Sequence, residues 1–169
     1  YSQTAYPNFE VVVVDNGSDD GTDEFLEQES RQRENLTIIS NRENLGFACA
    51  SNQGIQISRG QYVVLLNNDC IVTAGWLSGL IHHLGDSNVG AVGPVTNFSG
   101  NESRIAVAYH DLDDLPRFAW AYTSSHKEHT FEIDMLAMFC IAFRREVIEQ
   151  VGALDERFVM GMFEDDDYA

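Results

Sequence analysis

The sequence is poor in basic residues. Lys and Arg number 10 against 27 Asp and Glu among 169 residues, which gives a formal net charge of -17 at pH 7. Because nucleic-acid backbones are bound by clustered Lys and Arg, this balance excludes nucleic acid as an expected partner. An anionic substrate would need a metal cation or backbone N–H groups to offset the field of the carboxylates.

Cysteine and long apolar runs are also scarce. Cys49, Cys70 and Cys140 are far apart, odd in number and without a Cys-x-x-Cys spacing. This usage excludes a disulfide framework or a structural zinc site and predicts buried thiols in a reducing compartment. The sequence has no signal peptide and no apolar run of bilayer length, so we expect a soluble, cytoplasmic protein. It also has no Gly-rich loop with Lys or Arg to hold a triphosphate, which disfavours nucleotidyl transfer.

What is present is an alternation of apolar runs and amphipathic segments. Strands are predicted at 11–14, 36–40, 62–66, 89–95 and 135–143, and helices at 23–32, 46–58, 73–84 and 145–151. In the first helix, Phe25 and Leu26 are expected to face inward. Residues 103–130 have weak periodicity and predict no regular element. The rhythm is typical of a doubly wound, mainly parallel α/β sheet, and the length and 44% hydrophobic content fit one domain.

One stretch stands out within this pattern. The apolar run Tyr62 to Leu66 predicts a central strand covered on both faces, and it breaks off into Asn67, Asn68 and Asp69. Ligands bind at the carboxyl edge of such sheets, so Asp69 would face a crevice. The alternative is a simple turn, since Asn and Asp favour turns for local hydrogen-bonding reasons.

Three motifs resemble signatures of family 2 glycosyltransferases of the GT-A fold, in the rhamnosyltransferase-like branch. They are V-V-D-N-G-S-D-D-G-T from Val13, N-L-G-F-A-x-A-x-N-x-G from Asn44, and Asp155 to Phe158 followed by Glu164-Asp165-x-Asp167. Asn67-x-Asp69 is one substitution away from the Asp-x-Asp metal pair of GT-A transferases. The family begins with a further strand and continues with a further helix, so the resemblance implies a catalytic-domain fragment, truncated at both ends.

The resemblance implies roles for particular residues. Asp15 would accept the imide N–H of uracil or thymine, a donor that cytosine lacks. The implied nucleotide-binding residues are Asp15, Asn16, Gly17, Ser18, Gly46, Asn52 and Asn68, and a Mg²⁺ or Mn²⁺ ion would bind Asp69 with Asn67. Many family members carry Arg where Ser51 precedes Asn52, so the metal would take over more of the diphosphate.

The resemblance makes Asp165 the general base, with Glu164, Asp166 and Asp167 as supporting acids. Asp166 is its nearest competitor, because a one-residue shift in alignment exchanges the two. Four consecutive acids, Glu164 to Asp167, would otherwise be read as a solvated charge run.

The expected activity is inverting transfer of a hexosyl group from a UDP- or dTDP-linked sugar to a hydroxyl of a saccharide or lipid-linked acceptor, in cell-envelope polysaccharide synthesis. Residues 1–72 would form the nucleotide-binding half and 73–169 the acceptor-binding half of one domain. Peripheral membrane association through regions outside this chain stays open. A non-catalytic nucleotide- or carbohydrate-binding module is the alternative, because Asn67 replaces an acidic residue.

A calcium-binding loop competes at the first motif. Oxygen ligands from Asn16 to Glu27 match an EF-hand loop at several positions, with Gly21 at the sixth. Three features oppose it: Asn in place of the first Asp, Asp23 where an apolar residue is usual, and a preceding strand in place of a helix.

Overall fold

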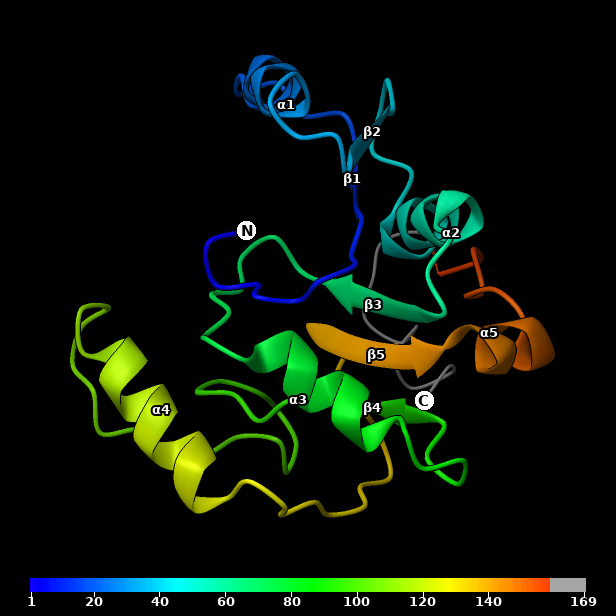
Figure 1. Ribbon diagram of the computed structural model, residues 1–169. Helices are drawn as coiled ribbons and strands as arrows, with labels where there is room; N and C mark the ends of the chain where they lie inside the picture. Colours follow the sequence, from blue (N-terminus) through cyan, green and yellow to red (C-terminus); the bar gives the residue numbers. More distant parts are fainter. Residues whose placement is uncertain (159–169) are drawn as a thin grey trace. The chain divides into compact units, whose positions relative to one another are not determined.

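The computed structural model of this chain describes residues 1–158. Strands and helices alternate along it in the order β1, α1, β2, α2, β3, α3, β4, α4, β5 and α5 (Figure 1). This alternation confirms the predicted α/β class. Contacts divide the chain into two compact units. The β1 unit comprises residues 7–63 and the described part of the segment from 144 onward, and the β5 unit comprises residues 1–6 and 64–143. A division of function near residue 72 stays a prediction.

The β1 unit is built on a pair of parallel strands. Its elements are β1 (Val11–Asp15), α1 (Thr22–Ser30), β2 (Leu36–Ser40), α2 (Phe47–Ile57) and α5 (Arg145–Val151). The β1–β2 register runs from Val11 opposite Leu36 to Asp15 opposite Ser40. α1 packs on β2 and α2 packs on β1. Because the strands are parallel, the residues that follow them lie at one edge of the pair.

Small residues let α2 approach β1 closely. Gly54 faces Val12 and Val14, and a Cβ built at Gly54 would lie 3.6 Å from Val14 Cγ2. Ala48 and Ile55 of the same helix are buried. The Ala and Gly content of α2 is therefore a packing feature.

Arg145 joins the two sequence segments of the β1 unit. Its Nε donates to the Gly60 carbonyl at 2.7 Å, and its Nη2 donates to the Ser58 carbonyl at 3.0 Å. The Arg145 N–H also donates to the Gln61 carbonyl at 2.8 Å. These bonds fix the start of α5 against the segment that follows α2.

The β5 unit holds most of a three-stranded sheet. Its elements are β3 (Tyr62–Leu66, whose first two residues belong to the β1 unit), α3 (Trp76–His83), β4 (Ala91–Val92), α4 (Leu115–Ser125) and β5 (Cys140–Arg144, whose last residue belongs to the β1 unit). The strand order is β3-β5-β4, and β4 runs antiparallel to β5. Ile141 and Leu84 are the largest fully buried side chains. The helix predicted at 73–84 is present as α3, and it buries Leu77 and Leu80.

Three predicted strand features are wrong. β4 has two residues where 89–95 was expected, because Gly and Pro disfavour strands and Gly90, Gly93 and Pro94 flank it. β5 begins at Cys140 and not at 135. β3 lies at one end of the order β3-β5-β4 and not at its centre, and its end is not covered on both faces, since Leu66 is 42% exposed.

Helix predictions also need correction. Helix α4 lies in the stretch for which no element was predicted, and none of its residues is buried. Its aromatic rings stack locally: Phe118 on Tyr122 with centroids 5.9 Å apart, and Tyr122 on His126 at 4.1 Å. In α1, Leu26 is buried but Phe25 is 60% exposed, so Phe25 does not face inward. Within residues 1–158, we find no helix both long and apolar enough to cross a membrane.

Candidate functional site

Asp15 ends β1 with a buried carboxylate. Only 6% of the residue is exposed, and Oδ1 accepts a hydrogen bond from the Ser18 N–H at 3.1 Å. The Asp15 carbonyl accepts the Asn41 N–H at 2.8 Å, which continues the pairing one step past the β1–β2 ladder. Among the described residues, Ser18 supplies the one hydrogen bond to this carboxylate. The second oxygen can therefore accept a donor from a ligand.

Gly17 presses the loop after β1 against the loop after β2. Its φ is +84°, and a Cβ there would lie 2.9 Å from the backbone C and Cα of Glu43. A side chain would meet both an unfavourable backbone conformation and a rigid neighbour. The glycine of the first motif is thus required by the close approach of two backbones.

The Asn16 side chain is committed within the protein. Its Nδ2 donates to Asn44 Oδ1 at 2.8 Å and to the Gly46 carbonyl at 3.2 Å. Its Oδ1 accepts from Asn41 Nδ2 at 3.0 Å and from the Leu45 N–H at 3.1 Å. An amide side chain offers two donors and two acceptor lone pairs, and all four are used here. A nucleotide contact by Asn16, which stays a prediction, would have to come from its backbone.

Gly46 sets the start of α2. It has φ 87°, and no side chain caps the helix. Its N–H donates to Asn44 Oδ1 at 2.9 Å. The first N–H groups of a helix lack partners inside the helix and form the positive end of its dipole, which suits an anion such as a phosphate.

Asn52 fastens the segment that follows α5. Its Nδ2 donates to the Leu154 carbonyl at 2.9 Å, and the Leu154 N–H donates back to its Oδ1 at 2.9 Å. Nδ2 also donates to Glu156 Oε1 at 3.0 Å. The described contacts of Asn52 are therefore structural, and its role toward nucleotide stays a prediction.

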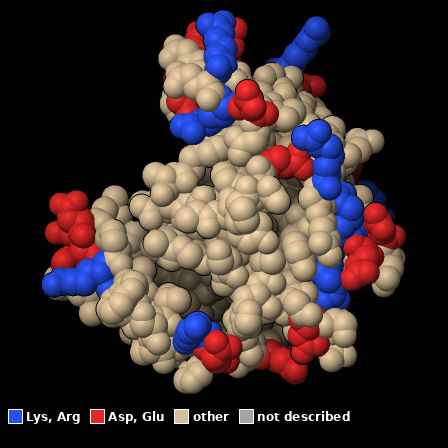
Figure 2. All heavy atoms as spheres, viewed as in Figure 1, with Lys and Arg blue, Asp and Glu red and all other residues tan. Residues whose placement is uncertain are grey.

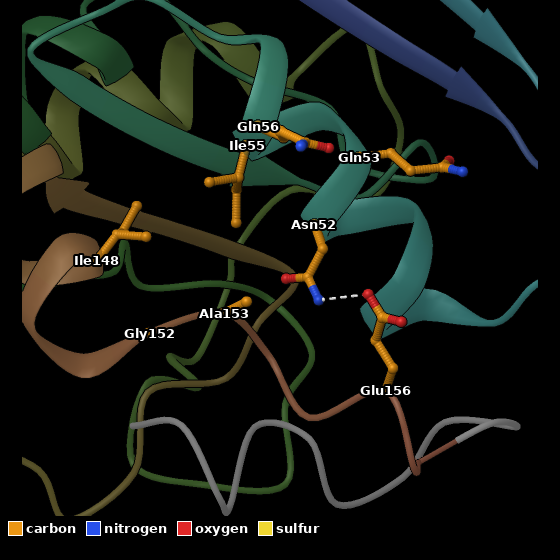
Figure 3. A pocket seen from close by; sticks show the side chains of 8 residues that line it. All are labelled: Asn52, Gln53, Ile55, Gln56, Ile148, Gly152, Ala153 and Glu156. Atoms are coloured by element: carbon orange, nitrogen blue, oxygen red, sulfur yellow. Dashed lines mark hydrogen bonds between the residues drawn. The ribbon is translucent and has the colours of Figure 1, made fainter.

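An open pocket of about 420 Å³ is lined by Asn52 and Glu156. Figure 3 shows Asn52 directed at Glu156, with Ile55 and Ile148 on another side. The lining is completed by Gln53, Gln56, Gly152 and Ala153. Amides, one carboxylate and apolar side chains make its chemistry suitable for a neutral polar molecule.

The strand-end triplet of β3 lies in the β5 unit. The Asn67 N–H donates to the Phe139 carbonyl at 2.8 Å, which fixes the backbone there. Asn68 and Asp69 are exposed. Within residues 1–158 no three His, Cys, Asp or Glu side chains gather into a metal site. Asp69 and Asn67 offer hard oxygen donors of the kind that Mg²⁺ and Mn²⁺ prefer, but other ligands would have to complete the coordination.

The thiols differ in their surroundings. Cys140 is buried, while Cys49 and Cys70 are half-buried, so the expectation of buried thiols holds for Cys140 alone. Burial and the nearby Cys70 raise the pKa of Cys140 to about 12. Burial and the Asp69 carboxylate raise the pKa of Cys70, whose Sγ lies 3.8 Å from Asp69 Oδ1.

The predicted acids Glu164, Asp165, Asp166 and Asp167 lie outside the described residues. The third motif is visible in its first part, where the Arg157 guanidinium pairs with Asp155. Hydrogen bonds from Arg157 lower the pKa of the half-buried Asp155 carboxyl. Asp155 is thus held as a local ion pair.

Many Arg side chains form such local ion pairs with Asp or Glu. Figure 2 shows Asp or Glu beside each group of Lys and Arg on the visible face. Two such pairs on and just after α1 join Arg31 to Glu27 and Arg33 to Glu29, both at 2.7 Å. Two observations count against the calcium-binding loop. Glu27, which would be its twelfth ligand, is paired with Arg31, and strand β1, not a helix, precedes the loop.

Sequence reasoning missed the side chains that organise the loop edge. Asn41 and Asn44 each hydrogen-bond to Asn16, and Asn41 also pairs with Gln53, through bonds of 2.8–3.1 Å. The available signal was a concentration of amide residues between β2 and the middle of α2. The structure brings Asp15, Asn16, Gly17, Ser18 and Gly46 to one edge of the β1 unit, whereas Asn67 to Asp69 belong to the β5 unit.

Comparison with known proteins identifies the family of this chain. Residues 1–152 match the model described as Glycosyl transferase family 2. The sequence is 31% identical over 163 residues to Glycosyltransferase AglE of Haloferax volcanii, covering 95% of this chain and 50% of AglE. It is 31% identical over 167 residues to the O-antigen biosynthesis protein RfbC of Myxococcus xanthus, covering 93% of this chain and 13% of RfbC.

A solved structure is similar over the same range. The mannosyltransferase PcManGT from Pyrobaculum calidifontis, in complex with GDP-Man and Mn²⁺, has a TM-score of 0.69 and 25% identity, covering 98% of this chain and 43% of that one. The present chain spans half or less of the length of each of these three proteins. The structural likeness confirms the predicted GT-A fold, and the match over residues 1–152 shows that this chain belongs to glycosyl transferase family 2.

Proposed function

We propose that this chain carries the donor site of an inverting glycosyltransferase that moves a hexosyl group from a UDP- or dTDP-linked sugar to a hydroxyl of a saccharide or lipid-linked acceptor. Family membership supports glycosyl transfer. The name of RfbC, an O-antigen biosynthesis protein, supports a role in cell-envelope polysaccharide synthesis. The observation that carries the donor assignment is the buried carboxylate of Asp15 at the loop edge of β1.

Asp15 would read the nucleobase. Its Oδ1 is held by Ser18, so its orientation is fixed before a ligand arrives. Its Oδ2 can accept the ring N–H of uracil or thymine, and cytosine has no such donor. A cytosine base would leave the buried carboxylate without a donor, which costs binding free energy. The contact therefore discriminates between uracil or thymine and cytosine.

The diphosphate would be bound by backbone N–H groups and by a metal ion. Helix α2 presents uncapped N–H groups at its start, beside the loop that carries Asp15. Asp69 and Asn67 are the residues that would hold Mg²⁺ or Mn²⁺, with diphosphate oxygens as further ligands. When bound, the ion would stabilise the negative charge that develops on the leaving diphosphate. The Mn²⁺ in the PcManGT complex supports this choice of ion.

The chemical step needs one base. The Asp165 carboxylate would take the proton of the acceptor hydroxyl, whose oxygen forms a bond to C1 of the donor sugar as the bond from C1 to the diphosphate oxygen breaks. The nucleoside diphosphate leaves with the electron pair of that bond. Because the attack comes from the face opposite the leaving group, the configuration at C1 inverts.

Isothermal titration calorimetry on the full chain tests the donor assignment. UDP, dTDP, CDP and GDP are compared with and without Mn²⁺, and GDP is included because PcManGT was solved with GDP-Man. We expect UDP or dTDP to bind best, with affinity that rises with Mn²⁺ in wild type and not in Asp69→Ala. Equal binding of all four nucleotides would contradict the role of Asp15, and an unchanged response to Mn²⁺ in Asp69→Ala would contradict the metal site. Product formation from a panel of sugar nucleotides then identifies the sugar.

A further inference from the structure

Four amide side chains form a connected cluster where the β1–β2 ladder ends. We define the amide cluster as Asn16, Asn41, Asn44 and Gln53. We propose that this cluster preorganises the donor site, and that Asn41 and Gln53 are positioning residues for nucleotide binding. The inference rests on the proposed function and names residues that the sequence motifs left without a role.

The centre of the cluster is a reciprocal pair. Asn41 Nδ2 donates to Gln53 Oε1 at 2.9 Å, and Gln53 Nε2 donates back to Asn41 Oδ1 at 3.1 Å. The second hydrogen of Asn41 Nδ2 goes to Asn16 Oδ1 at 3.0 Å. Asn41 therefore links the helix residue Gln53 to the loop residue Asn16, and each amide fixes the orientation of the next.

The cluster acts on backbone groups that the sheet does not hold. The last paired residues of the ladder are Asp15 and Ser40. Beyond them, Asn16 accepts the Leu45 N–H at 3.1 Å and donates to the Gly46 carbonyl at 3.2 Å. Asn44 accepts the Gly46 N–H at 2.9 Å. Past the backbone bond from the Asn41 N–H to the Asp15 carbonyl, the loop after β1, the loop after β2 and the start of α2 are thus joined by hydrogen bonds of these side chains.

These are the elements to which we assign the donor. Asp15 and Ser18 lie on the first loop, and the uncapped start of α2 follows Gly46. A loop whose polar groups were satisfied by water would have to be ordered when the nucleotide binds, at a cost in affinity. Fixing the loops beforehand with half-buried amide pairs removes that cost. Loss of the cluster should therefore weaken binding more than it changes the chemical step.

The test compares Gln53→Ala and Asn41→Ala with Gln56→Ala in the full chain. Gln56 is an exposed residue of the same helix, about one turn further on, and its side chain makes no hydrogen bond in the described part of the chain, so it controls for loss of a glutamine side chain from α2. UDP binding is measured by calorimetry in the presence of Mn²⁺, at a temperature well below the melting temperature of each variant. Thermal unfolding is followed by circular dichroism. Donor KM and kcat are measured with the sugar nucleotide that the panel identifies.

We expect Gln53→Ala and Asn41→Ala each to weaken UDP binding about tenfold and to raise donor KM with little change in kcat, while Gln56→Ala behaves as wild type. The double variant should lose little more than either single one, because the two residues act through one shared pair. Lower melting temperatures with unchanged UDP affinity and KM would show a merely structural role and overturn the inference. Should Asn41→Ala fail to fold, Gln53→Ala decides the question, since Gln53 lies inside helix α2 and Ala has the highest helix propensity. A wild-type chain that binds no nucleotide would refute the proposed function, and this inference with it.

Discussion

Replacing Gly17 by alanine should destabilise the protein by about 2–5 kcal/mol. Two effects combine. The left-handed backbone conformation, with φ +84°, accounts for about 1–2 kcal/mol when a Cβ is added. The new Cβ would also lie 2.9 Å from two backbone atoms of Glu43, and relieving such an overlap accounts for about 1–3 kcal/mol more.

Gly21→Ala separates these two effects. Gly21 lies in the same unit and has φ +88°, but the nearest atom to its added Cβ is the flexible Glu24 Oε2 at 3.4 Å. Gly21→Ala should therefore lower the free energy of unfolding only through the backbone conformation, by about 1–2 kcal/mol. Urea unfolding followed by circular dichroism gives both free energies of unfolding, and equal m-values show that the same transition is compared. Equal losses in the two variants would refute the contribution of the Glu43 backbone.

Other predictions concern binding, catalysis and pH. Asp15→Ala should weaken UDP or dTDP binding by about 1.5–3 kcal/mol in calorimetry, the range for a hydrogen bond to a charged group; CDP binding as tight as UDP in wild type would argue against it. Asp165→Asn should keep nucleotide binding and lower turnover by roughly 10²–10⁴-fold, and near-normal turnover would remove Asp165 from the mechanism. Burial raises the pKa of Glu10, but hydrogen bonds and the charge of Arg59 outweigh it and hold that pKa below 4.5. The stability difference between wild type and Glu10→Gln should therefore be complete well above pH 4.5 and disappear as the pH falls through the folded pKa, which acid titrations of unfolding can check.

The strands of the β1 unit could be predicted because their signal is local. Val11 to Val14 and Leu36 to Ser40 are apolar runs bounded by polar turns, and the ladder follows them closely. Helix α4 could not be predicted, because its aromatic residues stack on one another and bury none of the helix in the core. A stripe that faces no core leaves little hydrophobic period to detect.

Site prediction followed the same division. Motif resemblance selected Asp15 and Gly17, whose burial and close approach to Glu43 then supply a physical reason for their identity. It did not select Asn41 or Gln53, because their pairing joins positions 12 residues apart across a loop and a helix. Amide side chains carry no periodic signal, so only the folded geometry shows which of them meet.

The hydrogen bonds of Arg145 and Asn52 have a consequence for folding during synthesis. Their partners lie 85 and 102 residues away along the chain, and nearly all of the β5 unit is encoded between them. On the ribosome, β1, β2 and both of their helices emerge early, yet the β1 unit cannot be completed until α5 and the segment around Leu154 have been translated. Until then the edge of α2 that carries Asn52 and Ile55 stays uncovered, and it is a surface on which a chaperone or a misfolded neighbour can act.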